Sequence, residues 1–382
     1  MVHEPEPRRH WGGRSCEAKL RSLERMGKRI VGVDLFAGAG GLSLGAKWAG
    51  VDVRLAVEAD PNAASTYSRN HPRTKVIAGD VRTVGANELA AVRKTGTGRI
   101  LFGGPPCAGF SYSNRRSRNS ANPKNHLYRE FLRIVRIWTP DAVVFENVRG
   151  IADTSGGWFL DQVLEGLMTL GYASSHGILN AADFQVPQRR ARYFILAVRG
   201  RNPISLPQPN VNLKAPTVTA AVSDLPILRN GATVDWLAYR SGAISPYVER
   251  LRSTADGCTG HLVTRNCGEV LERYRHVPQG GNWESIPPRL LRSYKDYSRC
   301  HTGLYHRLDG SMPAPVIGNF RKNMLIHPTQ NRGLSVREAA RIQSFPDWYQ
   351  FDGSIGFQQQ QVGNAVPPAL ASAVFARLTK EL

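Results

Sequence analysis

The sequence is poor in cysteine: 5 of its 382 residues are cysteines, and no two of them form a CxxC pair. Scattered cysteines in odd number indicate neither a disulfide framework nor a zinc site, so no bound metal is expected. Long apolar runs are absent as well. No stretch approaches the roughly 18 residues that span a bilayer, and the first residues lack the apolar core of a signal peptide. These absences predict a soluble cytoplasmic protein with free thiols and no membrane partner.

Acidic residues are few beside the basic ones. The chain has 30 Asp and Glu but 50 Lys and Arg, which gives a formal net charge of +20. Such a surplus favours a polyanionic partner, with nucleic acid as the first candidate, whereas a generally basic surface is the plainer alternative. The length suits about two domains of roughly 150 residues each.

Short apolar segments alternate with helical patterns between residues 30 and 200. We expect strands at 30–36, 53–58, 75–78, 100–103, 142–146 and 193–198, and helices that include 42–49, 62–70 and 128–138. This alternation predicts parallel β–α–β units and therefore a doubly wound α/β sheet, in which ligands bind at the carboxyl ends of the strands. After residue 201 a proline-rich linker leads into turn-rich sequence, and helical patterns return only at LSVREAARIQSF and PPALASAVFARL.

The stretch DLFAGAGGLSLG, residues 34–45, predicts a strand, a glycine turn and the start of a helix. Gly38, Gly40 and Gly41 let the backbone approach a ligand closely, and the helix N-terminus offers N–H groups to an anion. The spacing is not a clean GxGxxG, which argues against a nicotinamide or flavin cofactor. The turn therefore indicates a cofactor of another kind.

Two carboxylates follow the next two expected strands. Glu58 stands where an acid accepts hydrogen bonds from ribose hydroxyls, and Asp80 stands where an acid can accept an adenine amino group. With the glycine turn they describe a nucleoside site that has an anion clamp but no basic residue for a pyrophosphate. S-adenosylmethionine suits this description better than NAD, although a solvated turn carboxylate is the alternative for either acid alone.

A cysteine follows the fourth expected strand, in GGPPCAGFS, residues 103–111. Pro105 and Pro106 stiffen this turn, which predicts a held and partly exposed thiol at Cys107, as a covalent nucleophile requires. A buried core cysteine is the commoner alternative for a single residue of this kind.

An acid and two arginines follow further strands. Glu146 ends a strand in VVFENVRG, where partial burial raises the pKa of a carboxyl group and makes it a competent acid. In QVPQRRARYF, Gln188, Arg190 and Arg192 alternate, which predicts that the two guanidinium groups share one face of a strand. Surface arginines on an edge strand are the alternative.

Taken in order, these stretches resemble the cytosine-5 DNA methyltransferase family. The matching stretches are DLFAGAGGLSLG, VEAD, GDVR, GGPPCAGFS, FENVRG, QRRAR, RGLSVREAARIQSFPDWY and QVGNAVPPALA. A prolyl-cysteine, an ENV and a QxRxR together are highly specific. The resemblance implies transfer of a methyl group from S-adenosylmethionine to C5 of a flipped-out cytosine in a specific duplex DNA sequence. It also implies a prokaryotic modification enzyme of the restriction–modification type.

The family's residue roles carry over by position. Cys107 becomes the nucleophile that adds to cytosine C6, Glu146 holds N3 and the exocyclic amine, and Arg192 steadies the base at O2. Arg190 supports that geometry or binds a backbone phosphate. The implied cofactor contacts are Phe36, Gly38, Gly40, Leu42, Glu58, Asp80, Pro105, Asn364 and Val366, and the implied DNA contacts are Ser111, Ser113, Arg115, Arg116, Arg118 and Gln188. Ala108 stands where the family usually has glutamine, which removes one side-chain hydrogen bond near the cysteine.

The resemblance further implies a domain plan and partners. The plan comprises a basic extension (1–28), a discontinuous Rossmann-like catalytic domain (29–204 and 355–382) and a smaller target-recognition domain with its hinge (205–354). Arg332 and Arg337 in the hinge are expected to be structural. The basic segment after Cys107 has the composition of a loop that closes over a flipped base, with a passive surface loop as the alternative. The implied partners of this monomer at the nucleoid are double-stranded DNA and a cognate restriction endonuclease.

Three other functions stay open at this point. A tRNA cytosine-5 methyltransferase shares the catalytic residues, although the CFT motif of that branch is absent. A catalytically inactive DNA- or cofactor-binding relative is disfavoured because Cys107, Glu146 and Arg192 are all present. A dinucleotide-dependent enzyme would have no use for Cys107.

Overall fold

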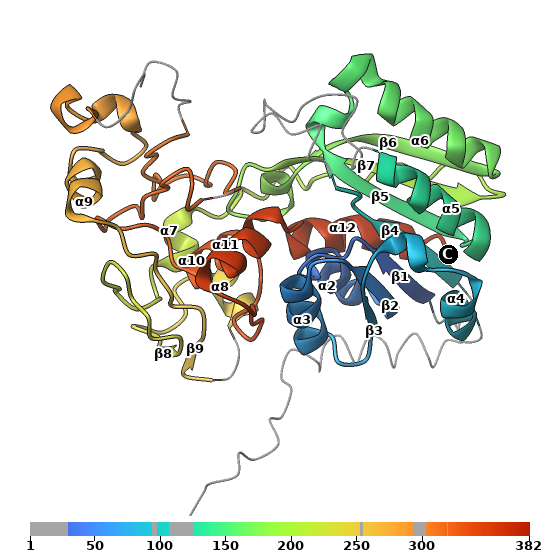
Figure 1. Ribbon diagram of the computed structural model, residues 1–382, viewed down its shortest axis with the longest axis horizontal. Helices are drawn as coiled ribbons and strands as arrows, with labels where there is room; N and C mark the ends of the chain where they lie inside the picture. Colours follow the sequence, from blue (N-terminus) through green and yellow to red (C-terminus); the bar gives the residue numbers. More distant parts are fainter. Residues whose placement is uncertain (1–29, 94–97, 107–125, 253–254, 293–302, 319) are drawn as a thin grey trace, which may run out of the picture.

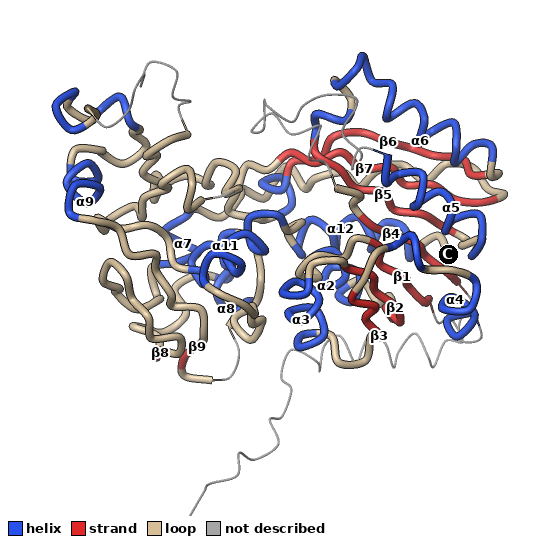
Figure 2. Tube along the Cα trace, viewed as in Figure 1, coloured by secondary structure: helices blue, strands red, loops and turns tan. Residues whose placement is uncertain are grey.

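The computed structural model describes residues 30–93, 98–106, 126–252, 255–292, 303–318 and 320–382. Figure 1 shows two lobes, of which one is built on a sheet with helices around it. Figure 2 shows that the long strands lie in this sheet lobe, whereas loops and short helices make up the second lobe. No helix in these described ranges is long and apolar enough to cross a membrane.

The sheet lobe contains one sheet of seven strands. Their bounds are β1 (Ile30–Leu35), β2 (Asp52–Glu58), β3 (Lys75–Ala78), β4 (Gly98–Gly103), β5 (Ala142–Val148), β6 (Tyr172–Asn180) and β7 (Ala191–Arg199). The spatial order is β3-β2-β1-β4-β5-β7-β6, and β1 to β5 are parallel. The predicted α/β class is confirmed. Because the order reverses between β1 and β4, the loops after these two strands flank the crevice in which doubly wound sheets bind ligands.

The last two strands differ from the prediction. β7 runs antiparallel to both β5 and β6, so parallel pairing throughout is wrong at this edge. β6 is absent from the predicted strands. Its sequence YASSHGILN is polar and half-exposed, because an edge strand lacks the apolar run of a buried parallel strand. Since β7 is antiparallel, its first residues lie at the carboxyl end of β5, with Arg192 opposite Val148.

Helices cover both faces of the sheet. They are α2 (Gly41–Trp48), α3 (Pro61–Asn70), α4 (Ala86–Arg93), α5 (Tyr128–Trp138), α6 (Trp158–Thr169) and α12 (Pro368–Thr379). Neighbouring strand residues face opposite sides. Leu101 packs in a cluster with residues of α4, α5 and α6, such as Phe131, whereas Phe102 packs with residues of α2 and α12, such as Phe375. The last helix therefore brings the C-terminal segment back beside α2, and it matches the predicted PPALASAVFARL helix to within one residue at each end.

The second lobe contains mostly short elements. They are α7 (Val218–Val222), α8 (Pro246–Leu251), α9 (Gly268–Arg275), α10 (Val336–Ile342), α11 (Ile355–Asn364), β8 (Leu237–Ala238) and β9 (Gly257–Cys258). Short 3-10 turns in the two lobes lie at Val81–Thr83, Arg149–Ile151, Thr154–Gly157, Ala181–Phe184, Trp283–Ser285 and Pro288–Leu290. α10 lies within LSVREAARIQSF and begins with a capping box of Ser335 and Glu338. The core of this lobe continues into the sheet lobe, because Ala39 and Leu44 belong to its buried cluster.

Buried arginines hold the second lobe together. Arg332 Nη2 lies 2.6 Å from Glu338 Oε1, and Arg337 donates to the carbonyl oxygen of Pro346 at 3.0 Å. Arg332 and Arg337 are each 1% exposed. The prediction that these two residues are structural is therefore confirmed, whereas the division of the chain at residues 204 and 354 stays a prediction.

Candidate active site

A buried ion pair marks the carboxyl end of β5. Arg192 Nε lies 3.2 Å from Glu146 Oε1, and 11% of each side chain is exposed. Glu146 pairs with Phe194 in the β5–β7 ladder, two positions from Arg192, so the ion pair is a diagonal contact on one face. Burial raises the pKa of Glu146, and the charges of Arg192 and then Arg190 act against this rise. The carboxyl group thus holds a proton at a higher pH than a solvated glutamate does.

The chain that leaves β4 passes directly against this carboxyl group. A Cβ atom at Gly104 would stand 2.5 Å from Glu146 Oε2, so no larger residue fits unless the carboxyl group moves. Next to it, Asn147 Nδ2 donates a 3.1 Å hydrogen bond to the carbonyl oxygen of Pro105, a buried residue. The first residues of GGPPC are thereby held against β5. Cys107 follows two residues after Pro105 but itself lies outside the described residues.

The segment that enters β7 joins the two lobes. Arg190 is buried, and its Nη2 donates to the carbonyl oxygen of Gly363, in α11, at 2.8 Å. Gln188 is 0% exposed, and its Oε1 accepts a hydrogen bond from the Ile317 N–H at 3.1 Å. The expected DNA contact of Gln188 stays a prediction, and in the structure this side chain lies in the interior and bonds to a residue of the second lobe.

The loop between β1 and α2 forms the other side of the crevice. Phe36, Gly38 and Gly40 have φ values of 58°, 54° and 85°. Glu58 Oε2 accepts a hydrogen bond from the Gly38 N–H at 2.7 Å, and Oε1 accepts one from the Asp60 N–H at 2.8 Å. A Cβ atom at Gly38 would meet nothing within 4 Å, so the loop borders open space. Each Glu58 oxygen keeps a lone pair for a ligand hydroxyl there.

Two further predicted cofactor residues, Leu42 and Val366, lie near the start of α2. Leu42 and Val366 are buried in one hydrophobic cluster. The carbonyl oxygen of Val366 lies 2.4 Å from the position that a Cβ atom of Gly41 would take, so the C-terminal segment touches the start of the helix. Asn364, at the end of α11, is exposed.

Asp80 follows β3 and is already paired. Both of its carboxylate oxygens accept hydrogen bonds from the Arg82 guanidinium, and these bonds lower the pKa of Asp80 to about 2. A ligand amino group at this carboxylate would therefore share it with Arg82.

Part of the predicted site lies outside the described residues: Cys107, Ala108, Ser111, Ser113, Arg115, Arg116 and Arg118. Conversely, the geometry brings two unpredicted residues to the site, Gly104 and Asn147. A signal for both is present in the sequence, because each stands directly beside a predicted residue, within GGPPC and within ENV.

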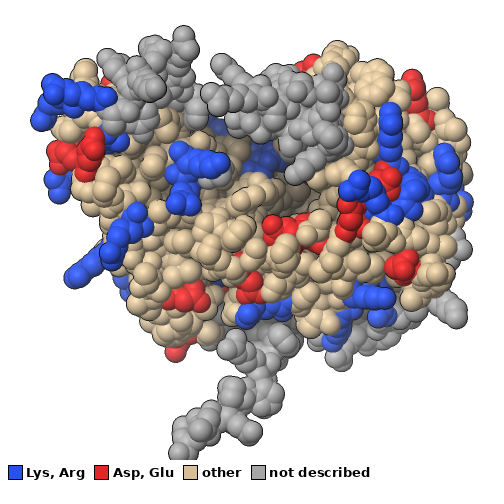
Figure 3. Space-filling view, in the orientation of Figure 1, with Lys and Arg blue, Asp and Glu red and all other residues tan. Residues whose placement is uncertain are grey.

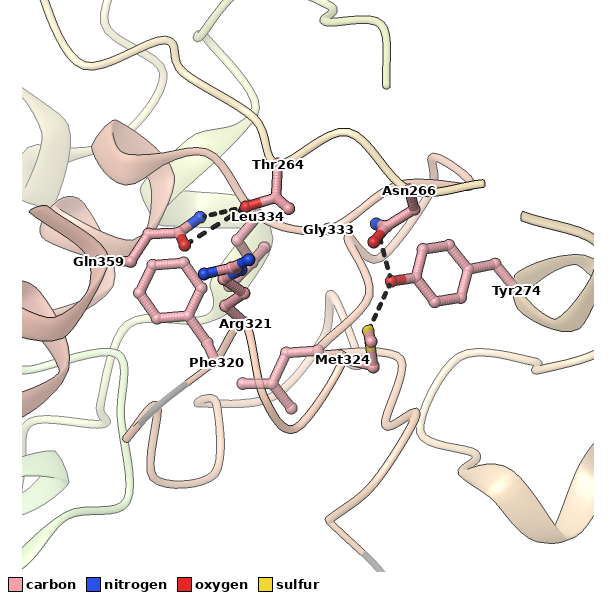
Figure 4. Close-up of a pocket in the computed structure, with 10 residues that line it drawn as sticks. Thr264, Asn266, Tyr274, Phe320, Arg321, Met324, Gly333, Leu334 and Gln359 are labelled. Carbon is pink, nitrogen blue, oxygen red and sulfur yellow. Dashed lines mark hydrogen bonds between the residues drawn. The ribbon is translucent and has the colours of Figure 1, made fainter. Parts of the chain in front are cut away.

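Basic side chains gather between the two lobes. Figure 3 shows Lys and Arg in the hollow between the lobes and over the second lobe, with a few acidic side chains below them. Figure 4 shows a second hollow, within the second lobe, which is lined by Thr264, Asn266, Tyr274, Phe320, Arg321, Met324, Leu325, Gly333, Leu334 and Gln359. Gln359 and Thr264 are hydrogen-bonded to each other there, and Arg321 lies close to them. Amide and guanidinium groups of this kind can bond the edges of base pairs.

The sequence of these elements matches a known family. A model of the C-5 cytosine-specific DNA methylases matches residues 30–380. The chain belongs to this family. The enzyme is therefore a DNA cytosine-5 methyltransferase, one of a class that generally uses S-adenosylmethionine, and the predicted resemblance is confirmed.

The enzyme is similar to Type II methyltransferases. It is 32% identical over 369 residues to M.DdeI of Desulfomicrobium norvegicum, which covers 91% of this chain and 88% of that protein. It is 35% identical over 350 residues to M1.HphI of Haemophilus parahaemolyticus, with 91% and 86% covered. The crystal structure of a candidate DNA modification methyltransferase encoded within an E. coli prophage matches with a TM-score of 0.75 at 26% identity, covering 92% and 99% of the two chains.

Proposed function

We propose that the enzyme methylates cytosine C5 through a covalent adduct between Cys107 and a base that is turned out of the DNA duplex. The observation that carries this proposal is the position of Glu146, which contacts both Arg192 and the Gly104 turn that leads to Cys107. Acid and guanidinium thus lie beside the segment that precedes Cys107 in the sequence. Because C5 and C6 are unreachable inside the base stack, the target base has to leave the duplex.

In the proposed reaction the Cys107 thiolate forms a bond to cytosine C6. The electron pair of the C5–C6 double bond moves to C5, which takes up the methyl group. S-adenosylmethionine, when bound, would supply that group as an electrophile, and its methyl–sulfur bond would break to leave S-adenosylhomocysteine. The C5 proton then leaves to solvent, the bond between C6 and sulfur breaks, and the ring regains its double bond with Cys107 released as the thiolate.

Glu146 and the arginines lower the barrier to this addition. The raised pKa of Glu146 lets its carboxyl group donate to cytosine N3 while it accepts from the exocyclic amine. Both contacts draw electron density from the ring as negative charge develops at C5. Arg192 lies against Glu146 and is assigned to O2 of the same base. Arg190 supports this arrangement from its buried position.

The glycine loop fits the nucleoside of S-adenosylmethionine. Open space borders Gly38, and Glu58 has lone pairs that can accept the two ribose hydroxyls. The further residues assigned to the cofactor are Phe36, Gly40, Leu42, Asp80, Pro105, Asn364 and Val366. Among them Asp80 accepts the adenine amino group only by sharing its carboxylate with Arg82.

The second lobe is assigned to DNA recognition. It surrounds a hollow with guanidinium and amide side chains, among them Arg321 and Asn266, which are groups that read base edges. Ser111, Ser113, Arg115, Arg116 and Arg118 are assigned to the flipped base and its phosphates. The Type II relatives support a modification enzyme. We further propose that it acts as a monomer and shares its target sequence with a restriction endonuclease.

Methyl transfer from radiolabelled S-adenosylmethionine to mixed-sequence duplex DNA tests the reaction, with Cys107→Ala as the matched control. We expect transfer by the wild type alone, and base-resolution mapping of the product supplies the recognition sequence. Transfer to tRNA but not to DNA would instead support an RNA methyltransferase.

The adduct has a separate test. Duplex DNA of the mapped sequence with 5-fluorocytosine at the target has no C5 proton to lose, so Cys107 cannot be released after methyl transfer. We expect a complex that survives denaturing electrophoresis with the wild type and none with Cys107→Ala. Equal yields from both proteins would exclude the adduct.

A further inference from the structure

The glycine loop rests on a buried chain of polar groups. Lys47 Nζ, in the last turn of α2, lies 2.8 Å from His71 Nδ1, and His71 Nε2 lies 2.9 Å from the Tyr349 hydroxyl. That hydroxyl in turn donates a short hydrogen bond to the carbonyl oxygen of Ala39, inside the loop. His71 is 1% exposed and Tyr349 is 0% exposed. The chain thus runs from α2, through the end of α3, to a residue of the second lobe and back to the loop.

The hydrogen bonds among these groups all run in one direction, from Lys47 through His71 and Tyr349 to Ala39. An ammonium group can only donate, so His71 Nδ1 accepts from Lys47 and the ring proton lies on Nε2. Nε2 then donates to the Tyr349 oxygen, which leaves the hydroxyl proton for the Ala39 carbonyl. Burial, and after it the charge of Lys47, lowers the pKa of His71, so the ring stays neutral as this arrangement needs.

The loop fits this chain closely at Gly40. A Cβ atom there would stand 2.6 Å from His71 Nε2 and 2.7 Å from the Tyr349 hydroxyl oxygen. Gly40 also has a φ of 85°, which favours glycine. The loop is therefore held on two sides, by Tyr349 at Ala39 and by Glu58 at Gly38.

We propose that Tyr349 is a positioning residue for the cofactor. Its hydroxyl, oriented by His71, sets the peptide between Ala39 and Gly40 and thereby places the Gly38–Glu58 pair against the nucleoside of S-adenosylmethionine. This inference rests on the proposed function. Tyr349 packs with Phe345 and Ile342 in the core of the second lobe, so this residue would contribute to cofactor affinity without touching the cofactor itself.

The test is the dissociation constant of S-adenosylmethionine, measured by calorimetry on the full chain, for the wild type and Tyr349→Phe. We expect roughly fivefold weaker binding and an equal rise in KM for the cofactor, as the loss of one hydrogen bond predicts. The kcat at saturating cofactor and the KM for DNA should stay unchanged. Hydrogen exchange without cofactor should become faster in peptides that cover residues 36–44.

Tyr247→Phe is the matched control. Tyr247 is also buried, and its hydroxyl donates to the carbonyl oxygen of Arg341 at 2.5 Å, within the second lobe. This variant should lose thermal stability as Tyr349→Phe does but bind the cofactor like the wild type. His71→Asn removes the group that orients the hydroxyl, so it should weaken binding alone but add little to Tyr349→Phe in the double variant.

Two results would overturn the inference in distinguishable ways. If both Tyr349→Phe and His71→Asn bound S-adenosylmethionine with wild-type affinity, the hydrogen-bonded groups Lys47, His71 and Tyr349 would have a structural role only. The proposed function would then stay intact. No binding of S-adenosylmethionine by the wild type would remove the proposed cofactor and this inference together.

Discussion

Gly104 lies so close to Glu146 that a Cβ atom on the glycine would stand 2.5 Å from the carboxylate Oε2. The two residues come from different motifs, one at the end of β4 and one near the end of β5. Because Arg192 holds the other carboxylate oxygen at 3.2 Å, Glu146 cannot yield without loss of that ion pair. The glycine therefore sets the position of the acid relative to the turn that carries Cys107.

Gly104→Ala should reduce turnover while the protein stays folded. The added methyl group displaces the Glu146 carboxyl group, and a misplacement of about 1 Å at a reacting group costs up to roughly 100-fold in rate. The measurement is kcat alongside the melting temperature. Gly268→Ala is the control, because a Cβ atom there meets nothing within 4 Å, and it should keep wild-type kcat. Equal kcat in the two variants would contradict the assigned role of Gly104.

Glu146→Gln should lower kcat by roughly 100-fold or more, the contribution of one positioned acid. Glutamine keeps an oxygen for Arg192 but has no acidic proton for N3. The variant should still bind DNA and S-adenosylmethionine with wild-type affinity, which separates a chemical defect from a binding defect. Full turnover by this variant would disprove the assignment of the acid.

Glu146→Gln should also change how the stability of the protein depends on pH. Burial raises the pKa of Glu146 above the ordinary 4.5, so the folded wild type binds this proton more tightly than the unfolded chain does. Wild-type stability therefore falls, relative to the variant, as the pH rises from 4.5 through the raised pKa of the folded state. Urea unfolding of both proteins at several pH values measures the difference. A wild-type stability that rises relative to that of the variant over this pH range would contradict the raised pKa.

The local parts of the fold could be predicted from the sequence. The predicted strand at residues 75–78 and the predicted helix at 128–138 have the observed bounds, because apolar periodicity and turn residues are properties of neighbouring residues. The edge strand β6 could not be found in this way, since its sequence lacks both an apolar run and a regular alternation.

Contacts between motifs that are far apart in the sequence could not be predicted from the sequence. The bond from Asn147 to Pro105 joins residues 42 positions apart, and the bond from Tyr349 to Ala39 joins residues 310 apart. Both motifs of each pair are visible in the sequence, but their contact depends on the packing of the strands and lobes. Gln188 gives a further example: its side chain is buried and accepts a hydrogen bond from the Ile317 N–H, a contact that the sequence of its motif does not predict.

Asn147→Asp should impair turnover at least as much as Asn147→Ala. The asparagine donates to the carbonyl oxygen of Pro105 through Nδ2 and accepts from the Val148 N–H through Oδ1. Aspartate keeps the acceptor but sets a negative oxygen against the Pro105 carbonyl, which pushes the turn away from β5. The stability loss should be roughly 1–3 kcal/mol, as for a buried polar group left unpaired. A comparison of kcat and urea unfolding among the three proteins decides the point, and wild-type kcat in the aspartate variant would refute it.

Glu338→Gln should destabilise the second lobe. It should also make the free energy of unfolding less dependent on pH in the acid range. Burial alone would raise the pKa of Glu338, but the charges of Arg332 and His327 and the hydrogen bonds from Arg332 and the Ser335 N–H together outweigh it and hold the pKa at about 2, below the ordinary 4.5. The wild type therefore keeps this stabilisation above pH 4.5 and loses it as the pH falls towards 2. Glutamine leaves the buried Arg332 without its counter-charge, which should cost roughly 3–5 kcal/mol at neutral pH. Urea unfolding at about pH 7 and about pH 3 should show a large difference at the first pH and a smaller one at the second. The exposed Glu249→Gln serves as the control with no expected change, and an equal effect of both substitutions would show that the buried pair adds no stability.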